Sequence, residues 1–279
     1  MAVPGYRQDM GRWDDDVSVG RRIAPAALVR GIALEWAWTG AHVSIYPLGL
    51  VRRRRHADPK RLTLDGLDPV RRGLFAGDVE AAGTPIVLVH GIVDNHSTFT
   101  VLRRALRRRG FERVVSVDYG WLATDLRTLA ARLSAEVARV CNQAGYEQVN
   151  VVAHSMGGLV ARYYVQRLGG DARVHTLVTM GTPHAGTRWA DGLPHPLVRQ
   201  LRPGSRFLAE LAAPSPGCRT RFVVVWSDLD QVVIPRENAR LRHPDLDVHE
   251  IAVHGVGHMS LPVDGGVVHE VCTALLDVT

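Results

Sequence analysis

The sequence predicts an α/β protein in which a mainly parallel sheet of about six strands has helices on both faces. Two observations lead to this prediction. Apolar runs such as residues 85–90 lack polar alternation, which is typical of strands that are buried on both faces of a sheet. Between these runs, apolar residues recur every three or four positions, which is the spacing of an amphipathic helix. Strands that alternate with helices form right-handed crossovers and hence a parallel sheet.

The expected strands and helices alternate through most of the chain. We expect strands at residues 85–90, 114–118, 149–153, 174–180, 221–226 and 248–253. We expect helices at residues 98–109 and 125–144, directly after the third strand, and at residues 265–276. With 279 residues, of which 46% are apolar, the chain is long enough for one large domain, which we place at residues 81–279. Functional residues of such sheets lie at the carboxyl ends of the strands.

Residues 1–80 lie outside this pattern, and we expect them to form a helical extension. Residues 23–51 are largely apolar and aromatic, although Arg30, Glu35 and His42 interrupt them. A helix packed on the domain is the preferred interpretation, followed by an anchor in the membrane interface and then by a spanning helix. A cleavable signal peptide is not recognised, because residues 1–20 carry several charges. We therefore expect a cytoplasmic or peripherally membrane-associated protein, with residues 23–51 as the candidate contact with a membrane surface.

Positive charge exceeds negative charge, and arginine supplies nearly all of it. The formal net charge is +6, and Lys60 is the only lysine. The basic runs at residues 52–55 and 103–109 are short, which favours a solvated face over attraction to an anionic membrane. We expect no nucleic-acid partner. The three cysteines match no metal-ligand spacing, and their odd number argues against a disulfide framework.

The strongest chemical signal is a serine that follows the third expected strand. Residues 152–158 read Val-Ala-His-Ser-Met-Gly-Gly and lead directly into a helix. This order places Ser155 on a tight strand-to-helix turn, which raises its hydroxyl above the edge of the sheet. Small residues are needed two positions before and two after it, and Ala153 and Gly157 stand there, although glycine is commoner at the first. We therefore expect Ser155 to be a nucleophile.

Two backbone amides are expected to form an oxyanion hole beside this serine. One belongs to Met156, the residue after the nucleophile, and the other belongs to Ile92, in the loop after the first expected strand. Gly91 allows a sharp turn that directs the Ile92 amide inward. The alternative for His90 and Gly91 is that they only end the strand.

A serine hydroxyl needs a neutral imidazole as its base and a carboxylate that orients the imidazole. Around a serine on such a turn, the acid and then the histidine follow along the chain. Asp230 is preferred as the acid because the run Asp-Gln-Val-Val-Ile-Pro holds it in a turn backed by apolar residues, and Asp228 is the alternative. His258, in a glycine loop before the last helix, is preferred over His254 as the base. His154, beside the serine, is expected to have a packing role.

With these residues, the chain resembles bacterial lipases and esterases of the α/β-hydrolase superfamily, including Bacillus-type and actinobacterial triacylglycerol lipases. The likeness lies in PIVLVHGIVDN, VNVVAHSMGGLVARYY and VTMGTPHAGT, and in the later runs SDLDQVVIP and GVGHMSLP. It covers roughly residues 85–275, and Ala153 in the serine turn is similar to the Bacillus lipases. The chain departs from the pattern in its first 80 residues, in lacking a recognised secretion signal, and in showing no recognisable calcium site.

The resemblance implies the α/β-hydrolase fold and the hydrolysis of hydrophobic carboxylic esters through an acyl-enzyme. The expected reaction uses Ser155, Asp230 and His258, acts on a small-molecule ester or a lipid, and needs no metal or organic cofactor. An acyltransferase or amidase with the same three residues is an alternative, as is a non-catalytic membrane-associated binding protein. A proline-rich stretch at about residues 184–216 is expected to form a small cap or lid.

Overall fold

A computed structural model describes residues 83–92, 98–111, 113–118 and 123–276, so the expectations for residues 1–80 lie outside this part of the chain. At its centre is a six-stranded sheet in the order β2-β1-β3-β4-β5-β6, in which every neighbouring pair is parallel. The strands are β1 (Ile86–Val89), β2 (Val114–Val117), β3 (Val149–His154), β4 (Val174–Met180), β5 (Arg221–Ser227) and β6 (Asp247–Val253). The predicted parallel sheet of the α/β-hydrolase type is confirmed.

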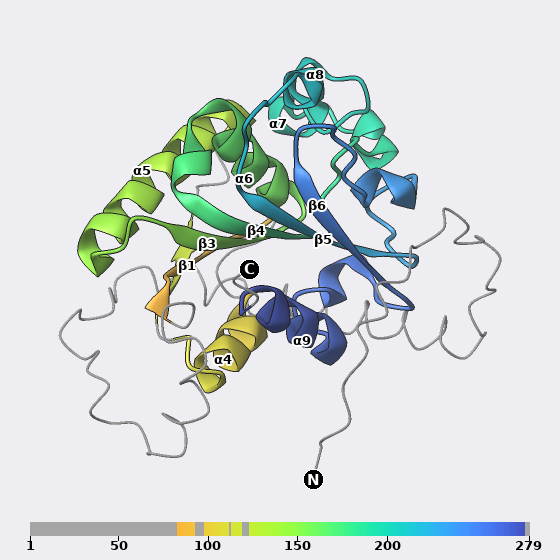
Figure 1. Cartoon of the computed structure of the whole chain (residues 1–279). Coiled ribbons are helices and arrows are strands. Elements are labelled where there is room, and N and C mark those ends of the chain that lie inside the picture. Colours follow the sequence, from red (N-terminus) through yellow and green to blue (C-terminus); the bar gives the residue numbers. More distant parts are fainter. Residues whose placement is uncertain (1–82, 93–97, 112, 119–122, 277–279) are drawn as a thin grey trace, which may run out of the picture.

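Helices cover both faces of the sheet (Figure 1). One face carries α4 (Thr100–Arg108) and α9 (Gly265–Ala274), and the other carries α5 (Leu126–Ala144) and α6 (Met156–Arg167). Successive side chains of β1 alternate between the two faces. Val87 and Val89 join the core under α5 and α6, whereas Ile86 and Leu88 join the core against α4 and α9. Burial on both faces explains why the strands read as continuous apolar runs.

Local signals set the ends of the long helices. The carboxylate of Asp125 accepts a hydrogen bond from the amide of Arg127 at 3.1 Å and so caps the start of α5. Gly145 ends the same helix in a left-handed conformation, with φ of 73°. Asp264 caps α9 in the same way as Asp125 caps α5. The caps at Asp125 and Asp264 lie in loops that follow the carboxyl ends of β2 and β6, whereas Gly145 leads into the start of β3.

Between β4 and β5 the chain leaves the sheet and forms short helices in a stretch that read as irregular from the sequence. They are η5 (Arg188–Gly192), α7 (Pro196–Arg199) and α8 (Arg206–Ala212), and α7 and α8 lie beyond α6 in Figure 1. Pro196 begins α7, where its missing N–H costs nothing. Ser205 caps α8 by accepting a hydrogen bond from the amide of Leu208. Helices this short bury too few residues for a periodic pattern to reveal them.

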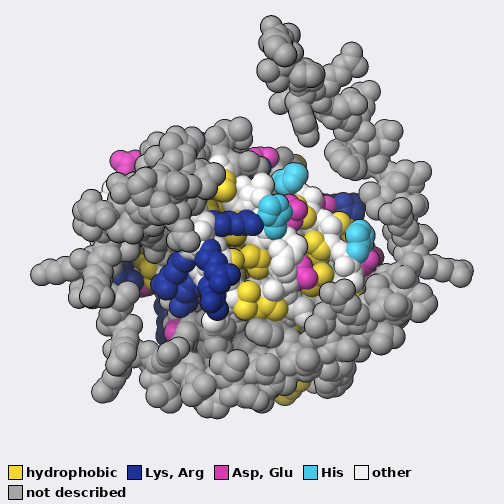
Figure 2. Space-filling model, turned by 90° about the horizontal axis from the view of Figure 1, so that it is seen from below, with side chains coloured by type: hydrophobic (Ala, Val, Ile, Leu, Met, Phe, Trp, Pro, Cys, Tyr) yellow, Lys and Arg dark blue, Asp and Glu magenta, His cyan; other side chains and the backbone are white. Residues whose placement is uncertain are grey.

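Arginine side chains gather on the face that carries α4. Figure 2 looks at this face from below the sheet and shows several Lys or Arg side chains close together. Among the described residues, α4 carries the exposed Arg104, Arg107 and Arg108. Their exposure agrees with a solvated basic face. None of the helices in the described part of the chain is both long and apolar enough to cross a membrane.

Candidate active site

Ser155 lies between β3 and α6 in a backbone conformation that residues other than glycine rarely adopt. Its φ is 54° and its ψ is −130°, and among the described residues it is the only non-glycine residue with a positive φ. Such strain persists where surrounding contacts fix the backbone. The amide of Ser155 donates to the carbonyl of Met180 at 2.9 Å, and its carbonyl accepts from the hydroxyl of Thr182 at 2.9 Å. These bonds hold the turn that presents the serine hydroxyl at the sheet edge.

Two glycines allow this turn to pack directly against neighbouring backbone. A Cβ atom on Gly157 would lie 2.5 Å from the carbonyl oxygen of Val89, at the end of β1. A Cβ atom on Gly158 would lie 2.0 Å from Oγ1 of Thr182, after β4. Both distances are shorter than any real contact, so neither position accepts a side chain without movement. The start of α6 therefore packs closely against the ends of β1 and β4.

Ser155, His258 and Asp230 form a continuous chain of hydrogen bonds. Ser155 Oγ lies 3.0 Å from His258 Nε2, and His258 Nδ1 lies 2.7 Å from Asp230 Oδ2. With a neutral imidazole, Nδ1–H donates to the carboxylate and Nε2 accepts the serine proton. The three residues follow β3, β5 and β6, so the parallel sheet brings their loops to one edge.

Asp230 is only 2% exposed, and three hydrogen-bond donors hold its carboxylate in place of water. Its Oδ1 accepts hydrogen bonds from the amides of Val232 and Val233, each at 2.8 Å, while Oδ2 faces His258. Burial alone would raise the pKa of Asp230, but the imidazole of His258 and the two amides outweigh it and lower that pKa below its usual value. The group is therefore an ionised acceptor at neutral pH.

The alternative acid and base contact each other instead. Asp228 Oδ2 lies 2.8 Å from His254 Nδ1, and Asp228 Oδ1 accepts a hydrogen bond from the amide of Gly255 at 2.9 Å. The side chain of His254 is 75% exposed. This pair joins the ends of β5 and β6 at the protein surface, so it forms a separate contact from the hydrogen-bonded chain at Ser155.

His154 packs beneath the histidine of the site. Its side chain is fully buried, its ring centroid lies 4.9 Å from that of His258, and its Nε2 lies 3.0 Å from the carbonyl oxygen of His258. A donor at this position fixes the backbone that carries the His258 ring. The residue next to the nucleophile thus supports the loop of the candidate base.

Met156 and Ile92 remain the candidate donors to an oxyanion. β1 and β3 are neighbours with Val89 opposite Ala153, so the loops that follow them lie side by side. Met156 is the first residue of α6, where the amides have no acceptor within the helix. His90 Nδ1 lies 2.8 Å from the carbonyl oxygen of Gly91. The carbonyl of Gly91 and the N–H of Ile92 belong to the same peptide group, and a trans peptide directs these two groups oppositely. Because the carbonyl faces the His90 ring, the Ile92 N–H points away from that ring.

Several residues that shape the site receive no role from the sequence, although they lie in the runs VTMGTPHAGT and SDLDQVVIP. Gly181 follows β4 with φ of 56°, and a Cβ atom there would lie 3.1 Å from His258 Nδ1 and 3.2 Å from Asp230 Oδ2. The hydroxyl of Ser227 donates to the carbonyl of Val256 and joins the acid loop to the histidine loop. Thr187 donates to the carbonyl of Val232 at 2.6 Å and ties the start of the cap segment to the acid loop. Membership of these two runs was the sequence signal available for them.

Possible metal ligands do not cluster in the described part of the chain, and its cysteines are unpaired. No group of three or more His, Cys, Asp or Glu side chains there could hold a metal ion. Cys141, Cys218 and Cys272 are all free thiols.

A parallel sheet with a serine on a strained strand-to-helix turn, linked to histidine and aspartate at later strand ends, defines a protein of the α/β-hydrolase fold. Solved structures agree with this fold. The mature Bacillus licheniformis lipase BlEst2 matches with a TM-score of 0.58 and 20% identity over 70% of this chain and 92% of that one. Aspergillus fumigatus lipase B matches with a TM-score of 0.59 and 15% identity over 69% of this chain and 52% of that one.

Sequence comparisons lead to lipolytic enzymes. The family model of palmitoyl protein thioesterase matches residues 85–211. A triacylglycerol lipase of Burkholderia plantarii is 31% identical over 42% of this chain and 34% of its own length. An sn-1-specific diacylglycerol lipase of Xenopus laevis is 30% identical over 44% of this chain and 39% of its own length. The matches thus span less than half of these relatives. The predicted resemblance to bacterial lipases is confirmed.

Proposed function

We propose that this protein is a serine carboxylic ester hydrolase of the lipase or esterase type, which cleaves hydrophobic acyl esters through an acyl-enzyme. The observation that carries the proposal is the hydrogen-bonded chain from Ser155 through His258 to Asp230. The similarity to proteins named triacylglycerol lipase and diacylglycerol lipase supports a lipid ester as the substrate.

In the acylation step, Ser155 Oγ attacks the carbonyl carbon of the ester while His258 Nε2 takes the hydroxyl proton. The positive imidazolium that results lies beside the ionised carboxylate of Asp230. The new oxyanion accepts hydrogen bonds from the amides of Ile92 and Met156. The tetrahedral intermediate then collapses, the C–O bond to the alcohol breaks, and His258 returns the proton to the departing alcohol.

In the deacylation step, water replaces the serine hydroxyl as the nucleophile. His258 takes a proton from the water as its oxygen attacks the acyl carbon, and the same two amides stabilise the oxyanion. The bond to Ser155 Oγ then breaks, His258 reprotonates the serine, and the free carboxylic acid leaves. These steps use only residues of this chain, a substrate and water.

The test is the initial rate of hydrolysis of p-nitrophenyl esters with acyl chains from acetyl to palmitoyl. We expect turnover that Ser155→Ala lowers by about a thousandfold or more, because the nucleophile is lost. Ser134→Ala, which removes a serine hydroxyl on α5, is the control and should keep the rate. Turnover that survives Ser155→Ala would contradict the assignment, and the preferred chain length would tell a lipase from a short-chain esterase.

An acyl thioester is a second candidate substrate, favoured by the match to the palmitoyl protein thioesterase model. The same attack by Ser155 would release a thiol in place of an alcohol. A palmitoyl thioester with a chromogenic thiol reagent, run beside p-nitrophenyl palmitate, compares the two. A kcat/KM for the thioester well above that for the oxygen ester would assign the thioesterase activity.

We propose that residues 1–80 form a helical extension to the catalytic domain of residues 81–279. A helix packed on the domain stays the preferred interpretation of residues 23–51, and contact with a membrane surface is the alternative. Trp36, Trp38 and Tyr46, followed by the basic run 52–55, favour membrane contact by their composition. If residues 23–51 contact a membrane surface, co-sedimentation with phosphatidylglycerol vesicles should be severalfold weaker for a Trp36→Ala, Trp38→Ala double variant than for the unchanged chain. Equal binding of the two proteins would count against membrane contact.

A further inference from the structure

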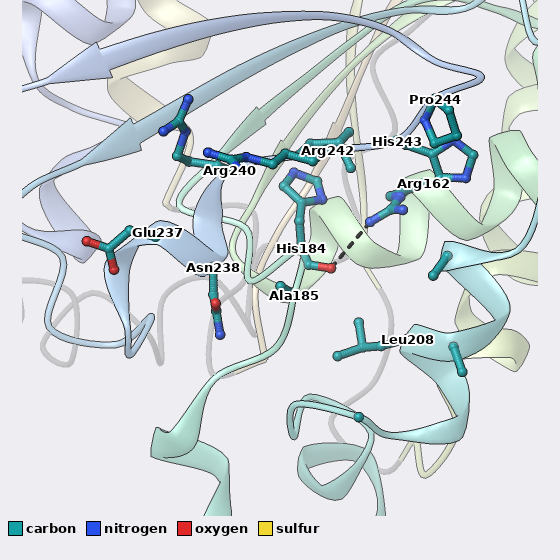
Figure 3. A pocket seen from close by; sticks show the side chains of 14 residues that line it. Arg162, His184, Ala185, Leu208, Glu237, Asn238, Arg240, Arg242, His243 and Pro244 are labelled. Atoms are coloured by element: carbon teal, nitrogen blue, oxygen red, sulfur yellow. Dashed lines mark hydrogen bonds between the residues drawn. The ribbon is translucent and has the colours of Figure 1, made fainter. Parts of the chain in front are cut away.

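A cavity of about 500 Å³ lies between α6, α8 and the loop that leads into β6 (Figure 3). Cavities of this size hold small molecules. Leu208 and Ala212 of α8 form one wall, and Leu241 and Pro244 of the loop form another. The described residues that line it do not include the members of the hydrogen-bonded chain at Ser155. It is therefore a compartment distinct from the candidate active site.

A buried cation lines the inner end of this cavity. Arg162 of α6 is 3% exposed, and it donates to the carbonyl oxygens of Leu211 at 2.9 Å and His184 at 3.3 Å and to the side chain of Gln166 at 2.7 Å. All three acceptors are neutral, and a guanidinium has five N–H groups, so two remain. Burial and the nearby Arg167 lower the pKa of Arg162 to about 9, which leaves it protonated at neutral pH. In these hydrogen bonds the positive charge of Arg162 therefore contacts neutral oxygen atoms and no carboxylate.

A second buried polar group faces the same space. His184 is 5% exposed, and Figure 3 shows its imidazole beside Arg162. Its Nε2 lies 3.1 Å from Thr179 Oγ1, whereas its Nδ1 is buried and has no hydrogen-bond partner among the described residues. An unsatisfied buried group of this kind destabilises the folded protein. Burial, and then the charge of Arg162, lower the pKa of His184 well below its usual value, so the ring is neutral.

Both groups can donate to one acceptor. When Nε2 of His184 accepts the hydroxyl proton of Thr179, Nδ1 carries the other proton and becomes a donor. Arg240 and Arg242 line the cavity as well and add positive charge. Among the described residues of the lining, Glu237 is the only acid, and it is exposed. The lining therefore combines apolar walls with N–H donors and a net positive charge.

We infer that this cavity binds an amphipathic carboxylate, a medium-chain fatty acid anion, with its head on Arg162 and His184 and its chain along Leu208 and Leu241. A carboxylate suits the N–H groups of one guanidinium and one imidazole, whereas a phosphate dianion carries more acceptor positions than they satisfy. The apolar walls match an alkyl chain. The inference concerns binding alone and goes beyond the proposed ester hydrolysis, on which it does not rest.

Isothermal titration calorimetry of the full chain tests this with sodium octanoate, octanol, octyl phosphate and inorganic phosphate as probes. Octanoate should bind at one site at least about tenfold more tightly than octanol, because only octanoate offers a charged acceptor to the Arg162 guanidinium. Equal affinities for octanoate and octanol would overturn the inference. Tighter binding of octyl phosphate or of inorganic phosphate than of octanoate would also overturn it, because the site would then select phosphate.

Two variants locate the site. Arg162→Gln should weaken octanoate binding at least tenfold, but it alters a buried network. Ala209→Phe, which replaces an exposed alanine of the cavity lining on α8, should also abolish binding by filling the space. Ala138→Phe, at an exposed position of α5 outside the lining, is the matched control and should bind octanoate like the unchanged protein. Octanoate binding that survives Ala209→Phe would place it elsewhere and overturn the inference.

Discussion

The two aspartates after β5 differ in what surrounds them far more than in their place in the sequence. Asp230 is buried and receives two backbone amides and the His258 imidazole, whereas Asp228 meets the exposed His254. A carboxylate orients an imidazole only if it is itself fixed and ionised. The amides of Val232 and Val233 provide both conditions, because they restrict the side chain and lower its pKa.

Exchanging each aspartate for asparagine separates these two pairs. Asp230→Asn should lower kcat/KM for a p-nitrophenyl ester by about a thousandfold to ten-thousandfold, because the amide favours the wrong tautomer of His258. Asp228→Asn should change it less than about twofold, because that side chain lies at the surface pair. Steady-state rates of the two variants give the comparison. A larger loss in Asp228→Asn than in Asp230→Asn would make Asp228 the acid.

Gly181 offers a second test at the level of one atom. Its φ of 56° disfavours any side chain, and a Cβ atom would lie 2.8 Å from Leu261 Cδ1 and 3.1 Å from His258 Nδ1. Gly181→Ala should therefore lower both stability, by about 1 kcal/mol or more, and kcat, by about tenfold or more. Urea unfolding and steady-state rates measure the two effects.

Gly145→Ala is the matched control for that substitution. Gly145 also has a positive φ, of 73°, but a Cβ atom there would meet nothing within 4 Å. Its replacement should cost stability to a similar degree and leave kcat unchanged. If Gly181→Ala lost stability alone, as Gly145→Ala should, Gly181 would have no influence on the position of His258.

At the residue scale, a site residue can be predicted from the sequence when its contacts are with residues close to it along the chain. The serine turn is local, because strand, Ser155, Gly157 and helix are adjacent in the chain and their order specifies the geometry. Gly181 and Thr182 act on residues that lie far along the chain, through distances that only the packed sheet defines. The cavity at Arg162 and His184 is of the same kind, since four separate segments line it.

At the scale of elements, one carboxylate joins a helical turn to the start of a strand. Asp171, in η4 (Gly170–Ala172), accepts hydrogen bonds from the amides of Arg219 and Thr220, each at 2.7 Å, and from the hydroxyl of Thr220 at 3.0 Å. Thr220 immediately precedes β5, which carries the acid loop at its far end. Burial would raise the pKa of Asp171, but these donors outweigh it and lower the pKa in the folded protein.

A lowered pKa in the folded state gives this contact a defined pH dependence. Its stabilisation is present above the pKa of the unfolded state, about 3.9, and is lost as the pH falls through the lower pKa of the folded state. Asp171→Asn should cost about 1–3 kcal/mol of unfolding free energy at pH 7. The difference from the unchanged protein should shrink as the pH falls below about 4.

Urea unfolding at pH 7 and at several acidic pH values measures this difference. Asp191→Asn is the control. The Asp191 side chain is 60% exposed, and its ion pair with Arg202 is long, at 3.9 Å, so little stability depends on it. A difference between Asp171→Asn and the unchanged protein that stayed constant with pH would show that the ionisation of Asp171 does not contribute.

The elements that the sequence predicts well are those with repeated patterns. β3 and α5 carry apolar runs and periodic leucines and valines along their whole length, so many residues support each assignment. α7 and α8 have four and seven residues, and α8 contacts α5 and α6, which lie far from it along the chain. One example is the bidentate pairing of Arg127 on α5 with Glu210 on α8, at 2.9 and 2.8 Å. No local pattern encodes such a contact.

At the scale of the whole molecule, the sheet separates two cores that share every strand. One core lies under α5 and α6 and the other against α4 and α9. Each strand contributes side chains to both, so neither core can lose its packing while the sheet stays intact. We therefore expect unfolding of this part of the chain to be a single cooperative transition. Substitutions in opposite cores should still act independently, since the sheet keeps their side chains apart.

Two buried valines test both expectations together. Val137 of α5 lies in the first core, and Val271 of α9 lies in the second, and both are fully buried. Val137→Ala and Val271→Ala should each cost about 2 kcal/mol of unfolding free energy, from lost burial and a small cavity. The double variant should cost their sum to within about 0.5 kcal/mol.

The control is the pair Val267→Ala and Val271→Ala, which lie one helical turn apart in one core. There the two cavities merge, so the two costs should deviate from additivity. Urea unfolding followed by tryptophan fluorescence and by far-ultraviolet circular dichroism measures these energies. Coincident curves with additive costs across the sheet fit one cooperative unit, whereas separate midpoints for the two signals would mean that the cores unfold independently.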